Sequence, residues 1–121
     1  MVATPQRDAK SWVGRFNMEG SLAWARTWGH VAAAAPTDVA VDASLRTWVV
    51  GTKRDRGDGG TDVFLIRYGP QGLLLGSMAL EAGVRRVEGG GVAPFSGGAY
   101  VSGTTLTPMG DNGGHLWSVA T

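Results

Sequence analysis

Hydrophobic residues along the chain fall into short runs of about five to eight residues, rich in valine, threonine and aromatic residues. Turn-forming residues separate the runs, as in Asn17-Met18-Glu19-Gly20 and Gly69-Pro70-Gln71-Gly72. This pattern predicts β-hairpins joined in a meander. The expected strands, followed by a ninth that begins at His115, are Ser11–Phe16, Ser21–Trp28, Thr37–Asp42, Thr47–Thr52, Asp62–Tyr68, Leu73–Leu80, Val84–Val92 and Ala99–Thr105.

One run, Ala32–Ala35, gives the single local helix signal of the chain. It is bounded by Pro36 and is too short to hold a helix unaided. We therefore expect a single helical turn or a loop at this place.

The strand-like runs recur at a constant offset of 52 positions without gaps. Trp48-Val49-Val50-Gly51-Thr52 matches Tyr100-Val101-Ser102-Gly103-Thr104, and Trp12-Val13 matches Phe64-Leu65 and then Leu116-Trp117. Aromatic residues replace one another at this offset, which indicates an internal repeat and favours packing over a sugar-stacking role. The expected packing positions are Trp12, Phe64, Trp48, Tyr100 and Trp117.

Four antiparallel strands repeated at about 50 residues are typical of β-propeller blades. We predict an all-β fold of two four-stranded antiparallel propeller blades, at residues 10–61 and 62–113. An N-terminal tail at residues 1–9 precedes them, and the first strand of a third blade follows at residues 114–121. Closed propellers use about four to eight blades. The uncovered faces are therefore expected to meet further blades of a longer protein, of which this chain is a fragment, or identical subunits; a two-sheet sandwich that stands alone is the third alternative.

The segments Trp12–Gly29, Asp38–Asp42 and Asp62–Tyr68 resemble the bacterial SBBP-type β-propeller repeat. In that family a D-x-F-hydrophobic strand leads through a turn to G-x-L-x-W, then to A-V-D and Y-V-x-G-x-T. The resemblance implies a core position for Trp24 and a large bacterial secreted or surface protein of unassigned biochemical role. It thus implies an extracellular or cell-envelope setting, although residues 1–10 have no apolar segment of a signal peptide.

The chain departs from this family pattern in four places, one of which is the glycine-rich loop expected after Trp28-Gly29, where the sequence is His30-Val31-Ala32-Ala33-Ala34-Ala35. Leu45 stands where the family usually has a turn glycine, which Gly97 keeps in the second copy. The family tryptophan is present as Trp24, whereas the second copy has Gly76. Asp42 is likewise answered by a proline, Pro94. These departures mark the copies as degenerate.

Composition limits the function classes. Glycine supplies 20 of 121 residues while β-branched and aromatic residues stay plentiful, which indicates short strands and turns rather than disorder. A net charge of +1 without a basic cluster predicts no nucleic-acid binding. The absence of cysteine excludes disulfides and thiolate metal sites. No apolar run approaches the roughly 18 residues of a membrane helix, so no membrane insertion is expected.

The acidic loop with Asp55, Asp58 and Asp62 places oxygen ligands on a glycine-rich backbone, which is the chemistry that calcium prefers. The spacing does not match the D-x-[DN]-x-[DN]-G-x₅-E calcium loop, and a solvated turn is the favoured interpretation. We expect Asp42 to cap a hairpin turn. Arg15 and Arg67 occupy matched positions, so we expect them to bond to carbonyls or carboxylates between blades.

These features favour a non-enzymatic scaffold or interaction protein without a cofactor. One alternative is a fragment of a quinoprotein-like propeller that binds pyrroloquinoline quinone. Its A-x-D-x-x-T-G-x-x-x-W docking motif is absent, because Ile66-Arg67-Tyr68-Gly69-Pro70-Gln71-Gly72 has no aspartate and position 76 is glycine. The other is a lectin-like module, in which Trp28 and the neighbouring His30 would contact a glycan or protein ligand.

Overall fold

The computed structural model describes residues 11–28, 34–54, 60–80, 86–106 and 113–120. Within these ranges the fold is all-β, as the sequence predicts, and every pair of neighbouring strands is antiparallel. The strands are β1 (Ser11–Phe16), β2 (Leu22–Trp28), β3 (Ala34–Val41), β4 (Thr47–Lys53), β5 (Asp62–Tyr68), β6 (Leu74–Leu80), β7 (Arg86–Phe95), β8 (Gly98–Leu106) and β9 (Gly113–Ala120).

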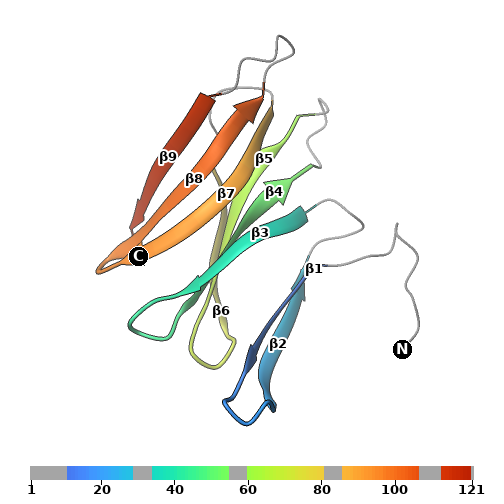
Figure 1. Ribbon diagram of the computed structural model, residues 1–121, viewed down its shortest axis with the longest axis vertical. Helices are drawn as coiled ribbons and strands as arrows, with labels where there is room; N and C mark the ends of the chain where they lie inside the picture. Colours follow the sequence, from blue (N-terminus) through green and yellow to red (C-terminus); the bar gives the residue numbers. More distant parts are fainter. Residues whose placement is uncertain (1–10, 29–33, 55–59, 81–85, 107–112, 121) are drawn as a thin grey trace, which may run out of the picture.

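The strands form three sheets that lie side by side (Figure 1). A four-stranded sheet with the order β3-β4-β5-β6, the middle sheet, lies between a two-stranded sheet, β1-β2, and a three-stranded sheet, β7-β8-β9. We call the two-stranded outer sheet the first sheet and the three-stranded outer sheet the third sheet.

The run Ala32–Ala35, where a helical turn or loop was expected, is partly described, and β3 begins at Ala34. Its last two alanines are therefore strand and not a helical turn or loop.

The grouping of strands into sheets differs from the expected pair of four-stranded blades. The middle sheet takes two strands from each side of residue 61, because β4 and β5 pair continuously from Thr47↔Tyr68 to Lys53↔Asp62. An internal repeat fixes the spacing between equivalent strands, but it does not fix which strand begins a sheet. The observed sheets therefore have two, four and three strands in chain order.

The 52-residue offset is visible in the backbone of the hairpin turns. Gly20 and Gly72 both have a positive φ, of 90° and 85°. The turn that contains each glycine is closed by a backbone hydrogen bond of 2.8 Å, from Asn17 N–H to the carbonyl of Ser21 and from Gly69 N–H to the carbonyl of Leu73. The β1-β2 and β5-β6 hairpins are thus two copies of one local structure.

The core lies on both faces of the middle sheet, because successive side chains of a strand point to opposite faces. One buried cluster forms between the middle and third sheets, and it contains Trp48, Val50, Val63, Leu65, Leu80, Val87, Val92, Ala99, Val101 and Val119. The other cluster forms between the middle and first sheets, and it contains Val13, Trp24, Val49, Phe64, Ile66 and Tyr68. Burial of each large side chain contributes about 1.5–3 kcal/mol to folding.

Polar side chains also bind the third sheet to the middle one. The carboxylate of Asp38 accepts a hydrogen bond of 2.9 Å from Val92 N–H. The hydroxyl of Thr61 donates to the carbonyl of Val87 at 2.7 Å and accepts from Val87 N–H at 2.8 Å. Thr52 in β4 accepts a hydrogen bond from a backbone N–H of β7 in the same way. These bonds fix the position of β7, which the hydrophobic contacts alone would leave free to slide.

The β3-β4 turn contains a strained residue. Leu45 has a φ of 63°, and its equivalent Gly97 has a φ of 104°. A left-handed backbone costs a residue with a Cβ about 1–2 kcal/mol, and glycine avoids this cost but loses about 0.5–1 kcal/mol of chain entropy. Because the Leu45 side chain is half exposed, Leu45→Gly is expected to raise the free energy of unfolding by about 0.5–1 kcal/mol in urea titrations. Leu45→Ala retains the strain, so it should show no gain; equal gains in both variants would contradict this explanation.

Candidate functional site

The aromatic residues expected in the core divide into buried and exposed ones. Trp24, Trp48 and Phe64 are buried, and Trp117 is half buried against the cluster between the middle and third sheets. Trp12 and Tyr100 differ from the expectation, since 49% and 46% of their surfaces are exposed. The reason is their place on strands of the two outer sheets, on the side opposite to their buried neighbours.

The exposed sides of the outer sheets carry further apolar residues, and we call them the end faces. On the first sheet, Trp12 lies 6.2 Å from Phe16 between ring centroids. On the third sheet, Tyr100 lies 4.7 Å from Phe95, and 70% of the Leu116 surface is exposed. Each end of the stack therefore presents aromatic side chains to solvent.

The repeat relates the end faces to the buried faces of the middle sheet. Trp12 is equivalent to Phe64, which packs against the first sheet, and Tyr100 is equivalent to Trp48, which packs against the third sheet. Positions that are 49% and 46% exposed at the ends are thus 6% and 1% exposed in the middle. The difference comes from the presence of a neighbouring sheet and not from the residue type.

Asp42 caps the β3-β4 turn, as the sequence predicts. Its Oδ1 accepts hydrogen bonds of 2.9 Å from the backbone N–H groups of Ser44 and Arg46. Its Oδ2 accepts from Arg46 Nε at 2.8 Å and from the Trp48 indole N–H at 2.9 Å. Burial alone would raise the pKa of this carboxyl, but the hydrogen bonds from Trp48, Arg46 and Ser44 favour the charged form and bring the pKa below its usual value. The carboxylate is therefore fully used in joining the turn to the core.

The matched arginines differ in their contacts. Arg15 donates a hydrogen bond of 3.0 Å to the carbonyl of Pro70, which joins the first and middle sheets as expected. The guanidinium of Arg67 lies 5.2 Å from the centroid of the Trp48 ring. Its Nε is buried and has no hydrogen-bond partner among the residues that the structure describes.

The buried phenol of Tyr68 has a raised pKa because burial disfavours its charged form, an effect that the nearby Arg26 partly offsets.

The last strand is shifted by one residue relative to the repeat. Val49 pairs with Ile66, but its equivalent Val101 pairs with Trp117, where the offset would place Ser118. A shift of one residue moves every side chain of a strand to the opposite face. Trp117 and Val119 therefore face the middle sheet, and Leu116 faces solvent.

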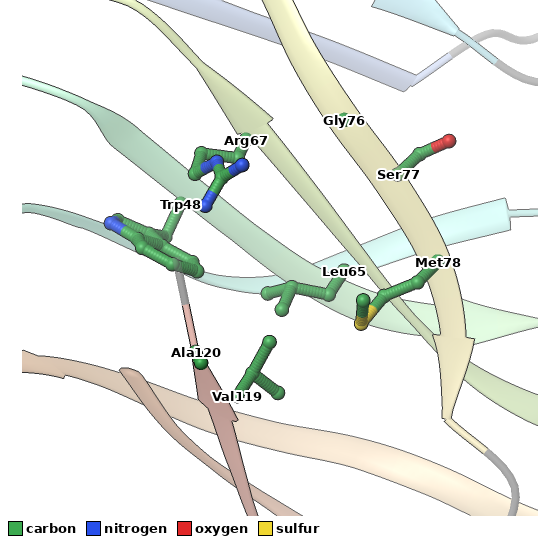
Figure 2. Close-up of a pocket in the computed structure, with 8 residues that line it drawn as sticks. All are labelled: Trp48, Leu65, Arg67, Gly76, Ser77, Met78, Val119 and Ala120. Atoms are coloured by element: carbon green, nitrogen blue, oxygen red, sulfur yellow. The ribbon is translucent and has the colours of Figure 1, made fainter. Parts of the chain in front are cut away.

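A cavity of about 110 Å³ lies between the middle and third sheets. It is lined by Trp48, Leu65, Arg67, Gly76, Ser77, Met78, Val119 and Ala120 (Figure 2). Sequence reasoning did not find this site, although the exchange of Trp24 for Gly76 was a signal that an interface between sheets loses a large side chain. It also missed the bonds that Thr52, Thr61 and Asp38 make to β7.

Several candidate ligand residues lie outside the described part of the chain, namely Asp55, Asp58 and His30. Asp62 begins β5, and Trp28 ends β2. Among the described residues, no group of three or more histidine, cysteine, aspartate or glutamate side chains could hold a metal ion. Nor does that part of the chain include a helix of the length and apolarity needed to cross a membrane.

The chain was also compared with known proteins. No family model matches the sequence, and no curated protein proved similar to it.

Proposed function

We propose that this chain is a non-enzymatic repeat scaffold of the β-propeller type, whose end faces bind further copies of the same chain. The SBBP-type family and an extracellular or cell-envelope setting belong to this proposal on the strength of the sequence resemblance. The observation that carries it is the exposure of Trp12 and Tyr100 at positions that neighbouring sheets bury elsewhere in the repeat.

The geometry supports head-to-tail association. In the repeat, the end face of the third sheet is equivalent to the side of the middle sheet that packs against the third sheet. The end face of the first sheet is equivalent to the opposite side of the middle sheet, which packs against the first sheet. The third-sheet face of one copy therefore suits the first-sheet face of the next. Such heterologous contacts build rings when the rotation closes and filaments when it does not. Aromatic side chains are well suited to the centres of such interfaces.

The polar side chains support a structural role. Asp42 holds a turn, and Asp38 and Thr61 hold β7 against the middle sheet. Each of these groups bonds to backbone donors or acceptors and so contributes to the fold. The end faces, by contrast, present exposed aromatic and aliphatic side chains that no neighbouring sheet covers.

Light scattering on purified protein tests the proposal. We expect the molar mass to rise above that of the monomer with concentration. Trp12→Glu and Tyr100→Glu each place a charge on one end face and should each block association at that face. Since a head-to-tail contact uses one face of each kind, each variant alone should be a monomer, and an equimolar mixture of the two should form a dimer.

The control is Met18→Glu, because this methionine is fully exposed in the β1-β2 turn, and the variant should associate like the unmodified chain. Circular dichroism checks that every variant is folded. A chain that stays folded and monomeric at all concentrations would overturn the proposal. Association of either single variant with itself would show a symmetric contact between like faces, which also contradicts the head-to-tail arrangement.

A further inference from the structure

The two interfaces between sheets can be compared position by position. Between the first and middle sheets, Trp24 is buried with its ring centroid 5.6 Å from that of Tyr68. The indole also lies against Gly72, where an added Cβ would meet the ring at 2.9 Å. An aromatic pair therefore fills this interface between β2 and β5.

The same place in the second interface has no aromatic side chain. Gly76 pairs with Arg67 as Trp24 pairs with Arg15, and the register shift that follows is the same in both hairpins. On the opposite wall, Val119 of β9 pairs with Ala99 of β8. The repeat equivalent of Ala99 is Thr47 of β4, which pairs with Tyr68. Gly76 and Val119 thus stand where the first interface has Trp24 and Tyr68. The cavity of about 110 Å³ is found between these two residues.

The walls of the cavity combine flat apolar surface with one cation. Leu65, Met78 and Val119 supply aliphatic and thioether surface, and the Trp48 ring closes one end (Figure 2). The guanidinium of Arg67 lies over that ring. Its buried Nε has no hydrogen-bond acceptor within the described part of the chain. A buried donor without a partner is unfavourable, so an acceptor that a ligand brings beside this guanidinium would be favoured.

We propose that this cavity binds a small planar aromatic carboxylate. The ring occupies the space that the Trp24 indole fills in the first interface, and the carboxylate accepts hydrogen bonds from Arg67. An apolar cavity of about 150 Å³ is large enough to take up benzene. The cavity here is smaller, at about 110 Å³, but it is open at its rim, where Ser77 and Ala120 are exposed. A single ring therefore fits when its polar end lies at the rim, outside the enclosed space. This inference does not depend on how the end faces are used.

Benzoate is the probe. In a titration followed by two-dimensional amide and indole NMR, we expect saturable shifts of Gly76, Ser77 and Trp48 with a dissociation constant on the order of 1 mM, the range for a ligand of so few atoms. Acetate carries the charge without the ring, and cyclohexanecarboxylate carries a ring that is not planar. Each should bind at least tenfold more weakly.

Two variants place a side chain in the cavity. Gly76→Trp restores the residue of the first interface and should abolish the benzoate shifts. Val119→Tyr restores the partner residue from the opposite wall, and it keeps the test decisive if Gly76→Trp does not fold. The control is Gly114→Trp, on β9 but not part of the cavity lining, where an added Cβ meets nothing within 4 Å. This control should bind benzoate as the unmodified chain does.

Arg67→Gln tests the role of the cation separately, and it should weaken benzoate binding at least tenfold. Absence of saturable benzoate shifts in the folded, unmodified chain would overturn the proposal. Equal shifts with acetate would overturn it too, because they would indicate an anion site without ring recognition. Retention of the shifts in a folded Gly76→Trp or Val119→Tyr variant would place the binding elsewhere and would have the same consequence.

Discussion

Replacing Trp48 by alanine is expected to lower the free energy of unfolding by about 3–5 kcal/mol, the usual cost of removing a large buried aromatic side chain. The indole is 1% exposed and packs in the cluster between the middle and third sheets. Its N–H also donates to Asp42, so truncation deprives the carboxylate of one of its donors. For a chain of this size the loss is a large part of the total stability. Urea denaturation followed by circular dichroism measures it.

Trp12→Ala is the matched control, because it removes the same side chain from an end face. At a protein concentration where the chain is monomeric, this variant should cost less than about 1 kcal/mol, as substitutions at exposed positions usually do. Trp48→Phe should fall between the two, since it keeps a buried aromatic ring but loses the N–H donor and part of the indole volume. The explanation is wrong if Trp48→Ala and Trp12→Ala lower the stability equally.

The comparison of Trp48 with Trp12 also shows how far the sequence could predict the fold. The alternation of hydrophobic and polar residues located the strands well, because it follows from the period of two along a strand. The turn residues located the ends of the strands, because a turn depends on the chemistry of a few neighbouring residues. The repeat offset correctly paired equivalent positions such as Trp12 with Phe64. It could not tell which of them a neighbouring sheet covers, since coverage depends on the place of a strand in the stack.

Two further differences have local causes. Ala34 and Ala35 join β3 because they pair with Lys53 and Thr52 of β4, and this pairing outweighs the weak helical preference of a short alanine run. The one-residue shift of β9 turns Trp117 inward. Nothing within the sequence of β9 signals that shift, because Leu116 and Trp117 are both suitable for burial and only the neighbouring sheet decides between them.

The candidate site was predictable only in part. Asp42 could be assigned to its turn because a capping aspartate acts within a few residues of the chain. The cavity lies between residues of β6 and β9, which are far apart in the sequence. The exchange of Trp24 for Gly76 shows that a ring is missing, but the sequence alone does not say whether the sheets close over the gap. The structure shows that they leave it open.

Replacing Asp42 by asparagine is expected to lower the stability at pH 7 by about 2–4 kcal/mol, because charged hydrogen bonds are worth about 1.5–3 kcal/mol each and buried donors lose their acceptor. The amide oxygen of asparagine can still accept the bonds from the backbone N–H groups of Ser44 and Arg46, but the bonds from Arg46 Nε and the Trp48 indole require the second carboxylate oxygen. Together the four bonds hold the pKa of Asp42 below its usual value in the folded chain. An unfolded chain binds a proton at this group at higher pH than the folded chain does. The stabilisation is therefore complete above the unfolded pKa and is lost as the pH falls through the folded one.

The stability difference between the unmodified chain and Asp42→Asn should then be constant from pH 7 down to about 5 and shrink at lower pH, as carboxylates become protonated. Taking the difference removes the contributions that the two proteins share. Ser44→Ala is the control, because it keeps the backbone N–H that binds Asp42 and should leave the pH profile unchanged. A difference that stays constant down to pH 2 would show that the charge of Asp42 does not stabilise the turn, and its hydrogen bonds would then be worth no more than those of a neutral amide.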